Sequence, residues 1–72
     1  MIDPTEADIG RGVIYRAAPQ FEAEPGVITS LGHPTSDPSR RTIFVRYATQ
    51  HPTAGGQATT ADDLEWEFPH AD

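Results

Sequence analysis

The stretch TIFVRYA, residues 42–48, is the most strand-like segment of the chain and decides the expected fold. Successive side chains of an extended strand point to opposite faces. One face carries the large side chains of Ile43, Val45 and Tyr47. The other carries Phe44 and Arg46. Two interpretations stay open: either the second face meets a partner, or both faces are buried, the second one beneath a loop.

Three further segments share this alternation of β-branched or aromatic residues. They are GVIYR (12–16), GVITSL (26–31) and the end of the chain, where Leu64, Trp66 and Phe68 alternate with glutamates. The segments between them are rich in proline, glycine and small polar residues, which is typical of loops. No segment repeats apolar residues at helical spacing over two turns.

A short helical turn is expected at 61–64, because Thr60 is followed three residues later by Asp63 in a helix-capping pattern. The sequence therefore predicts an all-β fold of about four to five strands with one short helical turn before the last strand. A small barrel suits so short a chain, because closing the sheet removes exposed edges.

The segments IGRGVIYR, EPGVITSL, IFVRYA and QATTADDLEW also carry a resemblance. Together they resemble a pattern in short, mostly uncharacterised phage and prophage proteins, over residues 9–67. The short turn before the last strand resembles SH3-like and Tudor-like barrels. The resemblance implies a small SH3-like barrel and a phage setting, and it implies no activity and no catalytic residue.

The expected organisation is a flexible N-terminal arm (1–8), a barrel (9–68) and a C-terminal tail (69–72). Leu64 and Trp66 are expected to close the barrel, and Phe68 to be less secure near the terminus. Their expected core partners are Val13, Val27 and Val45.

Composition narrows the possible functions. The chain has 72 residues, a formal charge of −6, five arginines without a lysine, and no cysteine. A chain of this size hides only about 60% of its unfolded surface, so one thin core favours binding over catalysis. Without cysteine there is neither a disulfide framework nor a thiolate zinc site. We expect a soluble, cytoplasmic, non-enzymatic protein with no cofactor, no signal peptide and no membrane span.

Aromatic and charged residues on the predicted strands are the candidates for partner binding. They are Phe44, Arg46, Tyr15, Arg16, Tyr47, Trp66 and Glu65. The four aromatic rings suit a groove or a cage for a cationic side chain, to which Glu65 or Glu67 would add a negative charge. The alternative is that Trp66 and Tyr47 belong to the core, each with its polar tip at the surface.

Two other chemistries have weaker support. The histidines, His33, His51 and His70, stand beside prolines in loops, and their spacing matches no metal-ligand motif. The five arginines would have to converge on one side to bind nucleic acid, against a negative net charge that repels phosphates.

The sequence thus favours a protein-interaction module of phage or prophage type that binds a host or phage protein. Nucleic-acid binding, or mimicry of nucleic acid by an acidic surface, is one alternative. A minor structural or assembly protein is another, and the oligomeric state stays open.

Overall fold

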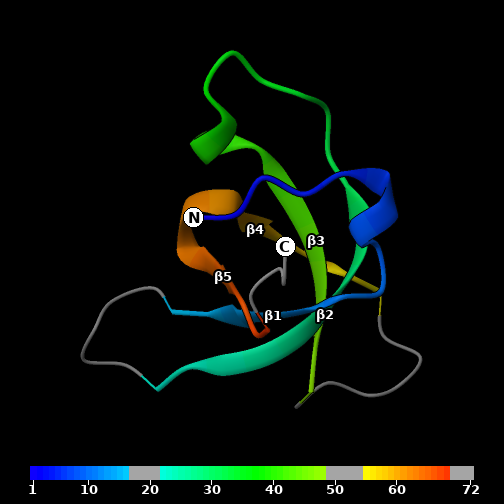
Figure 1. Cartoon of the computed structure of the whole chain (residues 1–72), viewed down its shortest axis with the longest axis vertical. Helices are drawn as coiled ribbons and strands as arrows, with labels where there is room; N and C mark the ends of the chain where they lie inside the picture. The colour runs from blue at the N-terminus through cyan, green and yellow to red at the C-terminus, as the bar shows by residue number, and fades with distance from the viewer. Residues whose placement is uncertain (17–21, 49–54, 69–72) are drawn as a thin grey trace.

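The computed structural model describes residues 1–16, 22–48 and 55–68. In this part the chain forms one five-stranded antiparallel sheet in the order β4-β3-β2-β1-β5 (Figure 1). The strands are β1 (Gly12–Tyr15), β2 (Glu24–Leu31), β3 (Thr42–Tyr47), β4 (Gln57–Thr60) and β5 (Leu64–Trp66). The helical elements are 3-10 turns: η1 (Glu6–Asp8), η2 (Pro38–Arg40) and η3 (Ala61–Asp63). The predicted all-β fold, with a short helical turn before the last strand, is confirmed.

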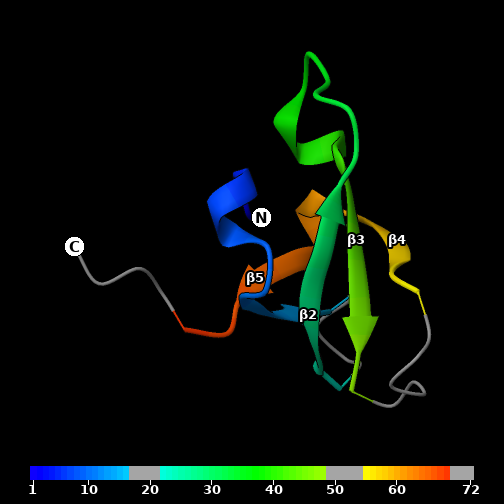
Figure 2. The same cartoon turned by 90° about the vertical axis from the view of Figure 1, so that its right-hand side faces the viewer.

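The connections between the strands determine the strand order of the sheet. Strands β1 to β4 follow one another as antiparallel neighbours, and η3 then turns the chain so that β5 returns beside β1. Figure 2 shows the long strands β2 and β3 side by side, with the connection between them rising above the sheet. The backbone N–H of Arg16 donates to the carbonyl of Asp63, which holds η3 against the end of β1.

The two faces of β3 differ as the alternation of its residues predicts. Its core side chains, Ile43, Val45 and Tyr47, are all buried. On the opposite face Arg46 is exposed and Phe44 is half-buried. Only the first face therefore belongs to the core, and Phe44 is covered in part.

The core agrees with the prediction at most positions and differs from it at Trp66 and Val27. Val13, Val45 and Leu64 are fully buried as expected, and Phe68 is 73% exposed. Trp66 is only half-buried and packs against the edge of this core. The full set of buried hydrophobic residues among those described is Ile2, Val13, Ile28, Ile43, Val45, Tyr47, Ala61 and Leu64.

The expectation that Val27 lies in the core is wrong, because its neighbour Ile28 points inward instead. Gly26 shares that inward face and packs so closely that an added Cβ would lie 2.6 Å from Cγ1 of Val45. Val27 is opposite Arg46 and belongs to the outer face of the sheet. The glycine thus lets β2 approach β3 closely.

A β-bulge in β2 changes which side chains face the core. Ile28 is opposite Val45 and Ser30 is opposite Phe44, so Thr29 is an extra residue between them. Its hydroxyl donates to the carbonyl of Phe44 at 3.1 Å. Past the bulge the alternation is reversed, so Ser30 is exposed and Leu31 packs against the core.

Strand β4 begins inside the connection between TIFVRYA and the final strand, which the sequence predicts as a loop followed by a helical turn, so the loop prediction is wrong at its C-terminal end. QATT has no large apolar residue to indicate a strand. It is extended because it pairs with β3, from Val45 opposite Gln57 to Thr42 opposite Thr60. The capping pattern places η3 correctly, although the Thr60 side chain makes no capping hydrogen bond.

The expected boundary between a flexible arm (1–8) and the barrel is also wrong, because Ile2 already belongs to the core. Ile2 is 2% exposed, and its N–H donates to the carbonyl of Ala61 beside η3. Pro4 is buried as well, and Arg41 donates to its carbonyl at 3.2 Å. Ile2 therefore belongs to the hydrophobic core, although its neighbours in the sequence are mostly acidic or polar. The expected tail 69–72 lies outside the described residues.

A cluster of Asp8, Arg11 and Trp66 joins this N-terminal segment to β5. The Asp8 carboxylate accepts the backbone N–H of Thr5 at 2.8 Å and a guanidinium N–H of Arg11 at 3.0 Å. The guanidinium carbon of Arg11 lies 4.0 Å from the centre of the Trp66 ring, a cation–π contact. Arg11 also donates to the carbonyl of Phe68 at 3.0 Å.

Replacement of Ile2 tests whether the N-terminal segment belongs to the folded unit. We expect Ile2→Ala to lower the free energy of unfolding by about 2–5 kcal/mol, because it empties a fully buried site. Urea denaturation followed by tryptophan fluorescence measures this change. Ile9→Ala is the matched control, since Ile9 is 45% exposed, and it should change stability little. Equal stability of both variants and wild type would show that residues 1–8 are an independent arm.

The Asp8 carboxylate predicts acid sensitivity. The Thr5 N–H and then the Arg11 guanidinium hold the pKa of Asp8 below its ordinary value of 3.8. The ionised carboxylate therefore stabilises the fold fully above pH 3.8, and this contribution is lost as the pH falls through the lower pKa of the folded protein.

Thermal melts across this pH range should show that Asp8→Asn destabilises the protein at neutral pH and weakens its dependence on acid. Asp3→Asn, an exposed carboxylate of the same segment, serves as control. An Asp8→Asn protein with the wild-type acid profile would remove this role from the Asp8 carboxylate.

Candidate functional site

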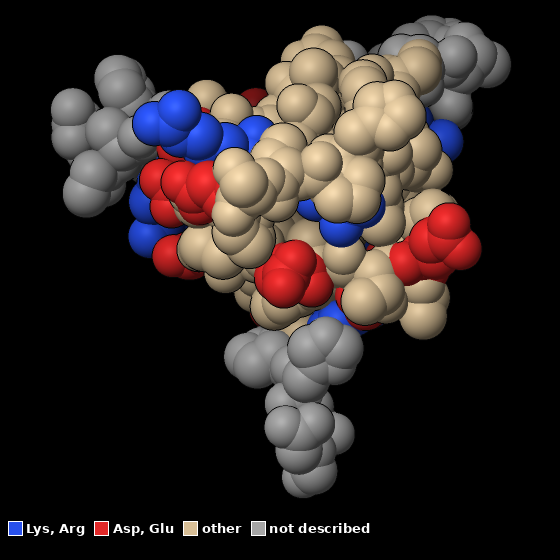
Figure 3. Space-filling view, turned by 90° about the horizontal axis from the view of Figure 1, so that it is seen from above, with Lys and Arg blue, Asp and Glu red and all other residues tan. Residues whose placement is uncertain are grey.

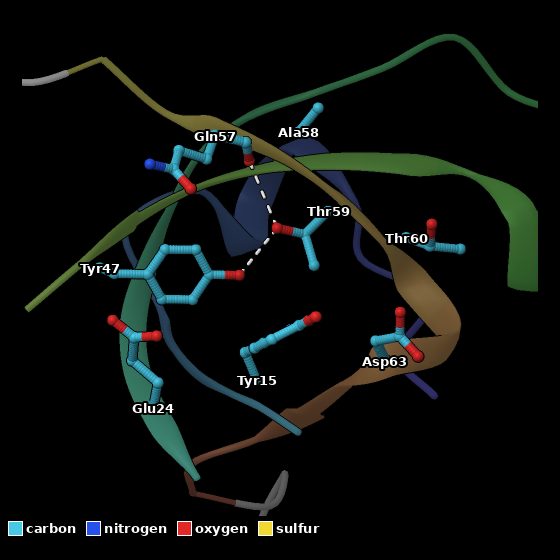
Figure 4. Close-up of a pocket in the computed structure, with 8 residues that line it drawn as sticks. All are labelled: Tyr15, Glu24, Tyr47, Gln57, Ala58, Thr59, Thr60 and Asp63. Carbon is cyan, nitrogen blue, oxygen red and sulfur yellow. Dashed lines mark hydrogen bonds between the residues drawn. The ribbon is translucent and has the colours of Figure 1, made fainter. Parts of the chain in front are cut away.

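A pocket of about 400 Å³ opens between β4 and the ends of the first three strands (Figure 4). Tyrosines, carboxylates and small polar residues form its walls. They are Tyr15, Glu24, Tyr47, Gln57, Ala58, Thr59, Thr60 and Asp63. The pocket thus combines ring faces with many hydrogen-bond acceptors.

The two tyrosines form the aromatic part of the pocket. Tyr15 ends β1 and Tyr47 ends β3, and each follows the inward alternation of its strand. Their ring centres are 5.8 Å apart and their planes meet at 68°, an edge-to-face arrangement. In Figure 4 both rings border the same space, below the ribbon of β4.

Tyr47 is fixed by its hydroxyl group. That oxygen lies 2.7 Å from the hydroxyl of Thr59, which in turn donates to the carbonyl of Gln57 at 3.4 Å. Because Thr59 uses its single hydroxyl proton in the bond to Gln57, the Tyr47 hydroxyl donates to Thr59. Burial raises the pKa of Tyr47 above 10.0, and this outweighs the opposing effect of the Thr59 hydrogen bond.

Two carboxylates border the tyrosines. Glu24 begins β2 on the same face as Gly26 and Ile28, and Asp63 ends η3. Their negative charges, like that of an ionised Tyr15, add to burial in raising the pKa of Tyr47. Two acidic side chains and no basic one are therefore among the described residues that line the pocket.

This arrangement suits a positively charged side chain. The face of an aromatic ring attracts a cation, and carboxylates and hydroxyl oxygens accept hydrogen bonds from an ammonium or guanidinium group. A phosphate or carboxylate ligand would meet repulsion from Glu24 and Asp63. The pocket is accordingly a candidate site for a cationic group.

The structure divides the residues predicted for partner binding among several surfaces. Only Tyr15 and Tyr47 line this pocket. Phe44 lines a second pocket, and Arg46 lies beside a third with Glu67. The rest lie elsewhere: Trp66 against Arg11, and Arg16 and Glu65 exposed at the surface. The acidic partners expected for the cage, Glu65 and Glu67, do not line the tyrosine pocket, where Glu24 and Asp63 are found instead.

Several arginines already have partners within the protein. Arg11 contacts Asp8, Arg40 lies 3.7 Å from Asp37, and Arg41 donates to the carbonyl of Gly32 at 3.1 Å. Figure 3 shows arginines and acidic side chains intermingled on one face of the molecule. These contacts give no support to a single basic surface.

In the described part of the chain, no three His, Cys, Asp or Glu side chains are grouped so that they could hold a metal ion. His33 is exposed there, and His51 and His70 lie outside it. Among the same residues, no helix has the length and apolar character needed to cross a bilayer.

Glu24, Asp63 and the four residues of β4 are the pocket residues that the sequence analysis missed as site residues. Glu24 lies two residues before Gly26 and four before Ile28, so it shares their inward face. The sequence alone does not tell which face of β2 is inward, so Glu24 could not be assigned to a pocket. The sequence indicates Asp63 as a capping residue and, together with Glu24, as part of an acidic surface, but not as a neighbour of the tyrosines. Strand β4 had no apolar pattern, so nothing in QATT indicated a pocket wall.

No protein-family model, curated protein or solved structure shows significant similarity to this chain.

We expect the hydroxyl of Tyr47 to be a weaker acid than that of an exposed tyrosine. The chain has two tyrosines, so Tyr15→Phe leaves Tyr47 as the single tyrosine. Its pKa in the folded protein should exceed 10.0, mainly because of burial. Neutral Tyr47 thus contributes fully to stability below pH 10.0, and this contribution is lost as the pH rises through the folded-state pKa.

Ultraviolet titration of tyrosinate in the Tyr15→Phe protein measures this pKa. The same variant unfolded in urea is the control and should titrate near the ordinary value. Identical curves for the folded and unfolded protein would contradict the burial of the Tyr47 hydroxyl.

Proposed function

We propose that this protein is a non-enzymatic interaction module that binds another protein by holding a positively charged side chain in the pocket lined by Tyr15 and Tyr47. The observation that supports this most strongly is the convergence of two edge-to-face rings and two carboxylates, from four separate elements, on one pocket. Each of these groups favours a cation, and together they favour it more than a neutral or anionic ligand.

The position of the pocket supports a role in binding. Its residues come from the ends of β1, β2 and β3, where a rigid sheet meets its connections, and binding residues are commonly presented there. The ring of Tyr47 is held by Thr59 before any ligand arrives, so little ordering is needed on binding.

The fold and setting form part of the same proposal. The strand order and the 3-10 turn between β4 and β5 support an SH3-like barrel. The sequence resemblance supports a phage or prophage protein, with a host or phage protein as partner, acting in the cytoplasm. Neither nucleic-acid binding nor a structural role is favoured by a specific feature of this pocket.

A short arginine peptide tests the proposal. Acetyl-Gly-Arg-Gly-amide should shift the NMR signals of Tyr15, Tyr47 and Asp63, and the same peptide with citrulline, an uncharged analogue of arginine, should not. Asp63→Asn and Glu24→Gln should each weaken binding about tenfold, equal to 1.4 kcal/mol, because each removes a charged acceptor. Higher salt should weaken the binding of the wild type.

The matched controls are Asp62→Asn and Glu22→Gln, which remove exposed carboxylates from neighbouring positions outside the pocket. Both should bind like the wild type. Equal NMR signal changes with the arginine and citrulline peptides would exclude a cation pocket. Equal losses of peptide affinity in the two pocket variants and the two control variants would exclude it as well.

A further inference from the structure

In the described part of the chain, the edge of β4 that faces away from β3 lies beside the tyrosine pocket, and its main chain has a defined orientation. The N–H of Ala61 donates to the carbonyl of Arg41 at 2.9 Å, so the main-chain groups of Ala61 point toward β3. Hydrogen-bonding direction alternates along an antiparallel strand. Thr59 therefore also points its main chain toward β3, while Ala58 and Thr60 point theirs away from it.

The β2 side of β3 agrees with this assignment. The carbonyl of Thr42 accepts the N–H of Gly32, and the carbonyl of Phe44 accepts the Thr29 hydroxyl. Thr42 and Phe44 thus face β2, so Ile43 between them faces β4, opposite Thr59. The outer edge of β4 accordingly presents the N–H and carbonyl groups of Ala58 and Thr60.

This edge has the features of a strand that accepts another strand. Within the described residues β4 pairs with β3 alone. Its four residues contain none of the charges, prolines or bulges with which edge strands commonly prevent pairing. Ala58 and Thr60 are exposed.

Side-chain direction connects this edge to the pocket. Residues directly opposite each other in a sheet place their side chains on the same face. Thr59 points its side chain into the pocket, where it meets Tyr47 (Figure 4). A residue opposite Thr59 on an added strand would therefore direct its side chain toward Tyr47 and Tyr15.

We propose that an extended segment of the partner pairs antiparallel with β4 and places an arginine side chain in the tyrosine pocket. This inference rests on the proposed function, since it concerns the same site. The observations that carry it are the outward main chain of Ala58 and Thr60, the inward side chain of Thr59, and the charges of Glu24 and Asp63.

Arginine fits the pocket better than lysine. Its planar guanidinium has five N–H donors and stacks on aromatic rings, whereas an ammonium has three donors and keeps its water more tightly. The pocket offers carboxylates on two sides, from Glu24 and Asp63, and the hydroxyl of Thr59 on the β4 side. A flat group with several donors can use these acceptors together.

The test uses acetyl-Ser-Thr-Arg-Thr-Ser-amide and two N-methylated forms of it. In an antiparallel pair the two threonines would be opposite Ala58 and Thr60 and would exchange hydrogen bonds with them. N-methylation of both threonines should therefore weaken binding at least tenfold, while N-methylation of the arginine should have little effect. The lysine peptide should bind several-fold more weakly.

Changes in the protein provide the second arm. Ala58→Pro removes the outward N–H, and proline is tolerated in an edge strand where its nitrogen faces away from the sheet. It should weaken binding of the pentapeptide at least tenfold more than it weakens binding of acetyl-arginine-amide, which cannot pair with the strand. Ala58→Val keeps the N–H and is the matched control. In the wild type, the amides of Ala58 and Thr60 should exchange more slowly with the peptide bound.

The outcomes separate this inference from the proposed function. If N-methylation of the threonines and Ala58→Pro have no effect while arginine is still preferred over citrulline, strand pairing is wrong and the cation pocket stands. If citrulline binds as well as arginine, both are wrong. If sedimentation shows a dimer that Ala58→Pro converts to monomer, β4 pairs with a second copy, and pairing with a partner segment is overturned.

Discussion

The structure depends on one strand that is hydrogen-bonded on both sides and buried on one face. β3 pairs with β2 and β4 and contributes Ile43, Val45 and Tyr47, three of the eight buried hydrophobic residues in the described part of the chain. A short chain without cysteine must obtain its stability from packing alone. The other elements are arranged around this face. Ile28 comes from β2, Leu64 from β5 and Ile2 from the N-terminal segment.

The same strand connects the core with the candidate site. The ring of Tyr47 is 7% exposed and packs with the core, while its hydroxyl belongs to the hydrogen-bonded wall of the pocket. Stability and binding are therefore coupled at this residue, so a change that loosens the core near Tyr47 also displaces a wall of the site. Asp63 has a separate attachment, through the main-chain hydrogen bond from Arg16 to η3.

The sequence predicted well those elements that carry their own apolar pattern. β3, β1 and the inward positions of Val13 and Leu64 follow from alternation alone. β4 has no such pattern, since QATT becomes a strand only by pairing with β3, and such a long-range effect is not visible in a local segment. Ile2 was assigned to an arm because its acidic neighbours dominate the composition of 1–8.

The candidate site was predictable only in part, for a related reason. Two of the seven proposed residues, Tyr15 and Tyr47, do converge, because both strands end at the same side of the sheet. The others were grouped by residue type, and type does not tell which surface a side chain reaches. The position of Glu24 required the register of β2, and that of Asp63 required the orientation of η3.

The extra residue at Thr29 reverses the alternation of inward and outward side chains partway along the eight residues of β2. Up to Ile28 even-numbered positions face inward, and from Leu31 onward odd-numbered positions do. Any comparison of this strand with another sequence that assumes one uninterrupted alternation would match Leu31 with surface residues and Ser30 with core residues. An alignment with a one-residue gap at Thr29 therefore matches core residues with core residues. A relative that lacks this residue is expected to have a straighter β2 and a flatter sheet.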